Sequence, residues 1–194
     1  TGLSAASLMA GEAALRTGLG LLYMGFPQSL SQVIEASLWE AVKLPWAEEE
    51  GVLSTFALAQ IKNAIDEYDI DAIAIGPGIS RASSAQELVV KLLREIKIPV
   101  VIDADGIYAL SNPDGLSALK STETPVVLTP HPGEFAVLSG QSVDDIENDR
   151  VGVSMKFAKA HGVVLVLKGV PTVIATPDGT AYLNSSGNSG LATG

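Results

Sequence analysis

Three short apolar segments in this chain each run directly into a loop of glycine, proline or acidic residues. The segments and the loops that follow them are 71–75 before 76–78, 100–102 before 103–105, and 126–128 before 129–134. In open α/β sheets, ligands bind in the crevice beyond the carboxyl ends of the strands. The three segments therefore predict one parallel sheet, with a functional site along its carboxyl edge.

Helices and strands are expected to alternate along the chain. We expect helices at 3–17, 28–38, 56–68, 83–95, 106–111, 133–139 and 147–161, and strands at 20–24, 71–75, 99–103, 125–129, 163–167, 172–176 and 180–183. The alternation predicts an α/β fold, and strands that are apolar throughout are typical of a sheet covered on both faces. Pro177-Asp178-Gly179 is a turn signal, so the last two strands should form an antiparallel hairpin. The acidic run 48–50 is expected to be a solvated turn.

The composition bounds the class of protein. A length of 194 residues fits a single domain at 1–194, and 47% hydrophobic with 18% charged residues suffices for a sizeable core. The chain has no cysteine, which excludes disulfides and thiolate chemistry and agrees with a cytoplasmic location. It has no apolar run of the ~20 residues that a membrane span needs, so we expect no membrane partner.

The formal net charge of −10 bears on the partners. Nucleic acid is not expected, because binding to a phosphate backbone requires clustered lysine and arginine. A phosphorylated small molecule is compatible with an acidic protein, since backbone N–H groups, helix N-termini and a few lysines can hold it.

Two loops offer backbone or carboxylate groups for chemistry. The glycines of Gly76-Pro77-Gly78 allow the backbone to approach a ligand, although an ordinary strand-to-helix turn has the same composition. Asp103 and Asp105 could orient a hydroxyl or a hydrated Mg²⁺. Alternatively, Asp105 only caps the next helix, which makes Asp103 the better functional candidate.

Basic side chains follow two later strands or end a helix. His131 lies between two prolines, which stiffen its loop and favour a contact with a ligand. His161 ends a helix before Gly162 and is expected to complement the helix dipole. Lys168 ends a buried strand, where it could neutralise a phosphate while Thr172 faces the same nucleotide. The alternative is a lysine that simply extends from the sheet edge into solvent.

The segment Asn184–Gly194 is rich in glycine, serine and asparagine. Such a sequence can turn successive N–H groups toward an anion, and the alternative is a low-complexity linker. Because the segment follows a hairpin directly, we favour an anion-binding turn.

Taken in order, these segments resemble the ADP/ATP-dependent NAD(P)H-hydrate dehydratases of the ribokinase-like superfamily. The resemblance is carried by Ala13–Gly18, Ile75–Gly78, Asp103–Asp105, Thr129–Glu134, Val166–Gly169 and Asn184–Gly194. The histidine loop and the last segment are its most specific parts. The resemblance implies a three-layer αβα ribokinase-like fold with a mostly parallel sheet.

The resemblance also implies an activity. Family members use ADP or ATP with Mg²⁺ to phosphorylate the ring hydroxyl of hydrated NADH or NADPH (NADHX or NADPHX), and loss of phosphate restores the reduced nicotinamide. The residues implied to bind this substrate are Ala6, Gly78, Asp103 and His131. The residues implied to bind the nucleotide are Lys168, Gly169, Val170, Pro171, Thr172 and Asn188. The resemblance further implies a homo-oligomer.

One departure from the family pattern concerns the catalytic turn. In the family, the last segment continues through a Gly-Ser-Gly-Asp turn whose aspartate activates the hydroxyl, whereas this sequence stops at Gly194 before that turn. We therefore assign no catalytic residue and expect the aspartate beyond Gly194. The chain is then expected to be an internal fragment of one domain, truncated at both ends and inactive alone.

Three other functions fit parts of the pattern. A ribokinase-like kinase of a hydroxymethylpyrimidine or thiazole alcohol would share the fold, but the histidine loop argues against it. A non-catalytic nucleotide-binding module would share the loops. A redox Rossmann enzyme would need the glycine fingerprint that this chain lacks.

Overall fold

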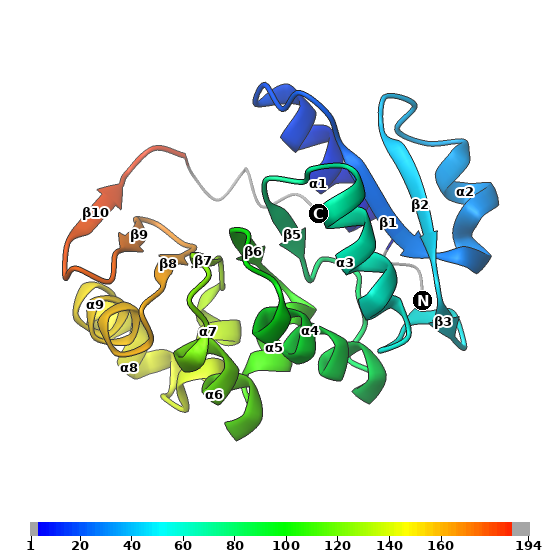
Figure 1. Cartoon of the computed structure of the whole chain (residues 1–194). Helices are drawn as coiled ribbons and strands as arrows, with labels where there is room; N and C mark the ends of the chain where they lie inside the picture. The colour runs from blue at the N-terminus through cyan, green and yellow to red at the C-terminus, as the bar shows by residue number, and fades with distance from the viewer. Residues whose placement is uncertain (1–3, 188–194) are drawn as a thin grey trace.

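The computed structural model describes residues 4–187, and its centre is a six-stranded sheet (Figure 1). In the order β10-β9-β8-β7-β6-β5, the strands are Ala181–Asn184, Thr172–Ala175, Val164–Leu167, Val126–Leu128, Val100–Ile102 and Ile73–Ile75. Strands β5 to β8 are parallel, and β9 is antiparallel to both β8 and β10. The predicted parallel sheet and its antiparallel hairpin are both confirmed.

Helices α4 to α9 lie along one side of this sheet (Figure 1). They are α4 (Ser83–Glu95), α5 (Asp105–Leu110), α6 (Pro113–Ser121), α7 (Pro132–Ser139), α8 (Val143–Asn148) and α9 (Arg150–His161). Helix α6 is not among the expected helices, although Asn112 caps it and Pro113 opens its first turn. The single helix expected at 147–161 is wrong, because Asp149 leaves the helical conformation and caps α9 with its side chain. No helix within residues 4–187 has both the length and the apolar character of a membrane span.

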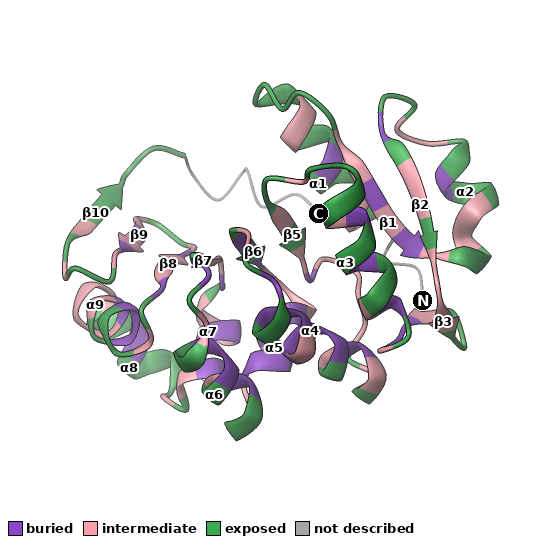
Figure 2. Cartoon of the chain, in the orientation of Figure 1, coloured by how far each residue is buried: buried purple, intermediate pink, exposed green. Residues whose placement is uncertain are grey.

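The two faces of the sheet differ in burial (Figure 2). In β6, Val100 and Ile102 are 2% and 1% exposed and join the core beneath the helices, whereas Val101 between them is 38% exposed. Strands β7, β8 and β9 show the same alternation of buried and half-buried positions. Uniformly apolar strands predicted cover on both faces, but within residues 4–187 these strands are fully buried only on the helical face.

The first third of the chain forms a smaller group of elements, of which β4 and α3 pack against the main core through Leu53, Ala57 and Ile61. The elements are α1 (Ser4–Arg16), β1 (Tyr23–Pro27), η1 (Gln28–Leu30), α2 (Ser31–Glu35), β2 (Val42–Trp46), β3 (Glu48–Glu49), β4 (Val52–Leu53) and α3 (Ala57–Glu67). Strands β1 and β2 pair in parallel over a small core of Met24, Phe26, Ile34 and Ala41. The solvated turn expected at 48–50 is confirmed only at Glu50, which is exposed, because Glu48 and Glu49 pair with β4 and the Glu48 carboxylate accepts hydrogen bonds from Ser29.

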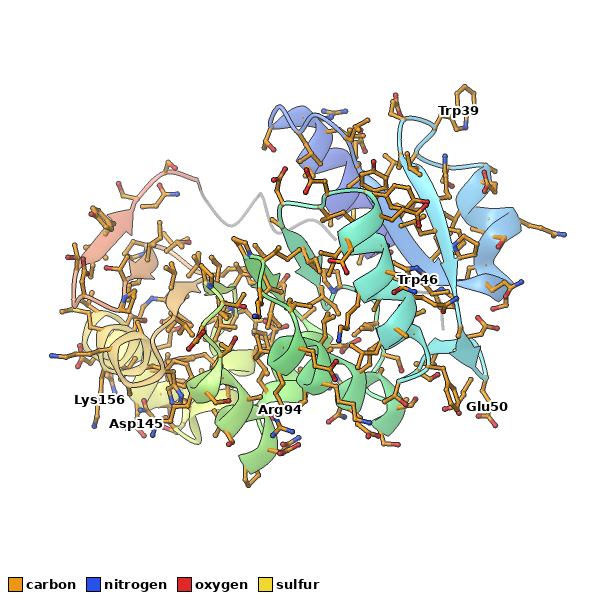
Figure 3. The ribbon with its side chains drawn as sticks, viewed as in Figure 1. Trp39, Trp46, Glu50, Arg94, Asp145 and Lys156 are labelled. Atoms are coloured by element: carbon orange, nitrogen blue, oxygen red, sulfur yellow. The ribbon has the colours of Figure 1, made fainter. Side chains whose placement is uncertain are left out.

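The strand expected at 20–24 is wrong by three residues at each end, since β1 covers Tyr23–Pro27. Its centre is Gly25, where a Cβ would lie 1.8 Å from the ring of Trp46 on β2. The indole therefore packs directly on the glycine backbone and fixes the register of the pair. Trp39, in contrast, is 82% exposed and projects away from the fold (Figure 3).

His161 ends α9 as expected, but its surroundings are partly buried. Its ring stacks on Phe157 with centroids 4.3 Å apart, and Gly162 follows in the left-handed conformation. Burial, and to a lesser extent the charge of Lys120, lower the pKa of His161 from its ordinary value of 6.5. The lowered pKa weakens the cationic support that His161 can give to the helix dipole.

Because of His161, we expect the protein to lose thermal stability as the pH falls from about 7 to about 5. The unfolded chain binds a proton near pH 6.5, whereas the folded chain binds it only at lower pH, so stability present above 6.5 is lost as the pH falls. In a thermal-shift series, His161→Gln should show a smaller decrease in melting temperature over this range. Equal decreases in both proteins would show that His161 does not contribute.

Candidate active site

The loops predicted to carry the site begin at the same level of the sheet. Ile75 pairs with Ile102, and Ile102 pairs with Leu128, so the residues after these strands lie side by side at the carboxyl edge. The first two loops touch, because Gly76 has φ +125° and a Cβ there would lie 1.8 Å from the carbonyl oxygen of Asp103. The edge is therefore built from backbone packed too closely for any side chain at position 76.

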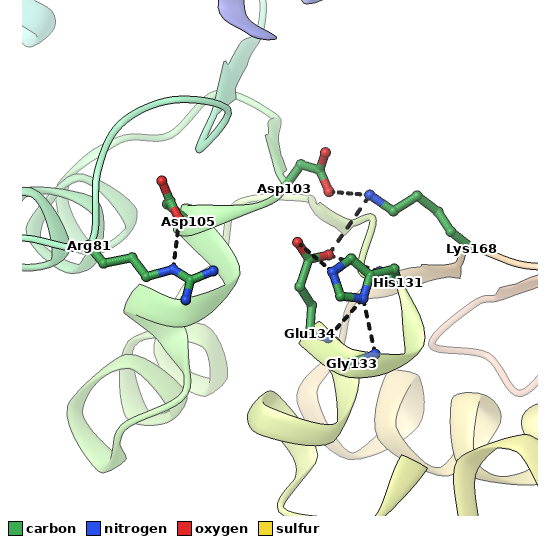
Figure 4. Close-up of polar contacts among 7 residues, drawn as sticks. All are labelled: Arg81, Asp103, Asp105, His131, Gly133, Glu134 and Lys168. Carbon is green, nitrogen blue, oxygen red and sulfur yellow. Dashed lines mark hydrogen bonds and ion pairs between the residues drawn. The ribbon is translucent and has the colours of Figure 1, made fainter. Parts of the chain in front are cut away.

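Lys168 crosses this edge and joins two neighbouring loops (Figure 4). Its Nζ lies 2.8 Å from Asp103 Oδ1 and 3.9 Å from Glu134 Oε2. Its backbone N–H donates to the carbonyl of Pro130 at 2.9 Å, which anchors the end of β8 to the histidine loop. The side chain remains 43% exposed, so the ammonium is paired with carboxylates and still open to a ligand.

His131 is held by the helix that it starts (Figure 4). As N-cap of α7, its Nδ1 accepts hydrogen bonds from the N–H groups of Gly133 at 3.0 Å and Glu134 at 3.2 Å. Since Nδ1 accepts, the proton of a neutral ring sits on Nε2, which lies 3.3 Å from Glu134 Oε1. The ring is thus fixed, as the flanking prolines suggested, but by helix capping, and 54% of the side chain stays exposed.

Glu134 connects the two basic groups, and it was not among the predicted site residues. Its carboxylate accepts from the backbone N–H of His131 at 2.9 Å, and its side chain is only 8% exposed. The same carboxylate faces both the imidazole of His131 and the ammonium of Lys168. The signal was present in the sequence, because a Glu at the third helical position completes a capping box.

The two aspartates of the second loop point to different partners (Figure 4). Asp103 pairs with Lys168, whereas Asp105 accepts from the Ser80 N–H at 3.2 Å and from Arg81 Nε at 2.9 Å. Asp105 is not the N-cap of α5, because Ala104 takes that position at φ +49°. Asp105 instead fixes the loop after β5. The structure therefore supports neither Asp105 as the cap of α5 nor an Mg²⁺ site shared by Asp103 and Asp105. Within residues 4–187, no group of three or more acidic, histidine or cysteine side chains could hold a metal ion.

The remaining predicted residues are spread over three places. Gly78, at φ +72°, shapes the turn after β5, and Ala6 lies on α1 in the smaller group of elements. Gly169, Val170 and Pro171 lie in the loop from β8 to β9, and Thr172 is the first residue of β9, where its hydroxyl donates to the Gly169 carbonyl at 2.9 Å. Asn188 falls outside the described residues.

Comparison with known proteins finds relatives over almost the whole chain. Residues 2–194 match the protein family described as NAD(P)H-hydrate dehydratase. The chain is 39% identical over 193 residues to the bifunctional NAD(P)H-hydrate repair enzyme Nnr of Moorella thermoacetica, spanning 99% of this chain and 36% of that protein. It is 36% identical over 192 residues to the ADP-dependent (S)-NAD(P)H-hydrate dehydratase of Bacillus subtilis, spanning 97% of this chain and 62% of that protein.

Solved structures share the fold. The ADP/ATP-dependent NAD(P)H-hydrate dehydratase of Bacillus subtilis, co-crystallised with ATP and Mg²⁺, gives a TM-score of 0.79 at 34% identity over 99% of this chain and 63% of that one. A ribokinase-like superfamily protein of Enterococcus faecalis gives a TM-score of 0.79 at 25% identity over 99% of this chain and 62% of that one. The ribokinase-like fold is confirmed, and the chain spans less than two thirds of the length of these relatives.

Proposed function

The chain belongs to the NAD(P)H-hydrate dehydratase family, and we propose that the protein carrying it restores hydrated NADH or NADPH to the reduced dinucleotide at the expense of ADP or ATP. The observation that supports this most directly is the cluster of Asp103, His131, Glu134 and Lys168 at the sheet edge. Family membership does not favour the vitamin-precursor kinase. A non-catalytic module would have no need of an exposed ammonium beside an ordered imidazole.

Lys168 is proposed to face the phosphates of the nucleotide. Phosphoryl transfer depends mostly on positioning and on stabilising the charge of the transferred group. The half-exposed ammonium can exchange its contact with Asp103 for a phosphate oxygen, while buried Glu134 keeps it in place. The loop Gly169–Thr172 would hold the rest of the nucleotide, together with Asn188.

The substrate side is proposed to lie at the loops of β5, β6 and β7. The half-exposed His131 ring carries its proton on Nε2, which would exchange its 3.3 Å contact with Glu134 for an oxygen of the hydrated nicotinamide. Asp103 and Gly78 follow β6 and β5, the next two strands along the sheet edge, and Ala6 would complete the contact from α1. Asp103 then stands between substrate and nucleotide, since it already pairs with Lys168.

The chemistry balances without a redox step. The terminal phosphoryl group passes to the ring hydroxyl, which leaves AMP from ADP or ADP from ATP. The carbon–oxygen bond then breaks with its electron pair departing on phosphate, and the neighbouring ring carbon loses a proton, which restores the double bond. No described residue is assigned as the base for the hydroxyl, and Mg²⁺ would enter bound to the nucleotide phosphates, as is common in phosphoryl-transfer sites.

The test is to incubate the protein that carries this chain with NADHX and either ADP or ATP and to follow the return of the near-ultraviolet absorbance of reduced nicotinamide. Absorbance should recover only when a nucleotide is present, and one equivalent of phosphate should be released for each dinucleotide restored. A hydroxymethylpyrimidine offered in the same assay serves as the competing substrate. Phosphorylation of that alcohol, without any recovery of NADH, would refute the proposal.

A further inference from the structure

Arg150 is the first residue of α9, and its side chain is directed at the loop between β8 and β9. Its Nη2 donates hydrogen bonds to three backbone carbonyls, those of Leu167 at 3.1 Å, Lys168 at 2.9 Å and Pro171 at 3.2 Å. Its Nη1 pairs with Glu147 at 2.8 Å, and only 10% of the side chain is exposed. One guanidinium nitrogen therefore donates hydrogen bonds to carbonyl oxygens at both ends of a single loop.

The loop has no room for a side chain on the face that covers this guanidinium. Gly169 has φ +150°, and a Cβ there would lie 2.4 Å from Arg150 Nη2. A glycine is required at this position for both reasons, since few side chains tolerate the dihedral angle and none would fit the space. In the sequence, Arg150 lies 19 positions before Gly169 (169 − 150).

The hydrogen bonds to Arg150 also fix the direction of the peptide N–H groups. In a trans peptide, the C=O and the N–H of one unit point in opposite directions. Because the Leu167 and Lys168 carbonyls turn toward the guanidinium, the N–H groups of Lys168 and Gly169 turn away from it. The N–H of Lys168 accordingly donates to the Pro130 carbonyl, on the side of the histidine loop. Without Arg150, three carbonyl oxygens in close proximity would lose their common donor.

We propose that Arg150 is a positioning residue for the nucleotide. It holds carbonyl oxygens, which would repel phosphate, on the α9 side of the loop, and so leaves the Lys168 ammonium facing the ligand, while the Gly169 N–H donates to the Thr172 hydroxyl at 3.3 Å. Arg150 itself touches no ligand in this arrangement. The inference rests on the proposed function, because it assumes that the loop 168–172 binds ADP or ATP.

The test compares Arg150→Gln and Arg150→Lys with the unmodified protein. Calorimetry measures the Kd for ADP, for ATP and for NADPH, the last as a probe of the dinucleotide side. Loss of one or two charge-assisted hydrogen bonds should weaken nucleotide binding roughly 10- to 100-fold in Arg150→Gln, with NADPH changed less than about threefold. Lysine keeps the charge but not the planar guanidinium. The nucleotide Kd of Arg150→Lys should therefore lie between those of the unmodified protein and Arg150→Gln.

Arg94→Gln is the matched control, because Arg94 pairs with Asp114 at the exposed end of the helical layer (Figure 3). It removes a guanidinium far from the loop and should leave both affinities unchanged. Equal weakening of nucleotide and NADPH by Arg150→Lys, or no weakening of either, would overturn the positioning role while the repair activity stands. If the unmodified protein binds neither ADP nor ATP, the proposed function itself fails, and the inference with it. Should Arg150→Gln not fold, Arg150→Lys alone decides between these outcomes.

Discussion

Lys168→Gln is expected to lower the rate of nucleotide-dependent repair by roughly 100- to 1000-fold, the loss seen when one group that stabilises transition-state charge is removed. Glutamine keeps most of the length of the side chain but has no positive charge to set against a phosphate. Phosphoryl transfer leaves little else for the protein to supply, so the loss should fall mainly on kcat. Initial rates of NADH recovery at saturating nucleotide would measure it.

The fold itself should tolerate this change. Lys168 is 43% exposed, and ion pairs of that kind contribute only about 0–1 kcal/mol to stability. Lys62→Gln provides the matched control, because Lys62 pairs with Glu95 at a similar exposure of 45% and lies outside the site. The role of Lys168 would be refuted if both variants kept full activity, or if Lys168→Gln lost activity only in proportion to a loss of folded protein.

The carboxyl ends of β5, β6 and β7 could be predicted from the sequence, because they depend on local pattern. Apolar runs bounded by glycine, proline or aspartate place the last residues of β5, β6 and β7 within one residue of where they lie. Helix α4 has the expected bounds, Ser83–Glu95, since its apolar face repeats at helical spacing and nothing interrupts it. The first strand lies three residues later than expected, and the packing of its Gly25 on Trp46, 21 positions later (46 − 25), is not visible in local pattern.

The partners of the site residues could not be predicted in the same way. The sequence favoured Asp103 over Asp105 as the functional residue, but only the fold reveals that Asp103 faces Lys168 and Asp105 faces Arg81. Arg150 has no motif around it, and its importance appears only when three carbonyls converge on it. Glu134 differs from both, since the capping-box spacing was visible and would have brought it into the predicted site.

The bare face of the sheet shows a further limit of reasoning from composition. Residues such as Val101 are apolar, which predicts that something covers them, but composition does not say which segment does so. Local pattern thus predicts where a strand lies, and only the three-dimensional arrangement reveals what lies against it.

Gly76→Ala is expected to destabilise the fold by about 3–5 kcal/mol, the range of severe core changes. The added methyl would lie 1.8 Å from the Asp103 carbonyl oxygen, and the φ of +125° is itself unfavourable for alanine. That carbonyl accepts from the N–H of Gly106 at 3.0 Å, in the first turn of α5, so the helix start must move with it. Urea unfolding followed by circular dichroism would measure the change.

Gly140→Ala separates the two causes of this effect. Gly140 ends α7 at φ +72°, and a Cβ there would meet nothing within 4 Å, so alanine should cost only the conformational term of about 1–2 kcal/mol. The additional loss of stability in Gly76→Ala is then caused by the steric clash between the loops that follow β5 and β6. Because Asp103 moves in that variant, its contact with Lys168 should also be lost, and activity should fall further than the folded fraction does. Similar losses of stability in the two variants would show that the loops separate without cost, and that the sheet edge is not the rigid frame of the site.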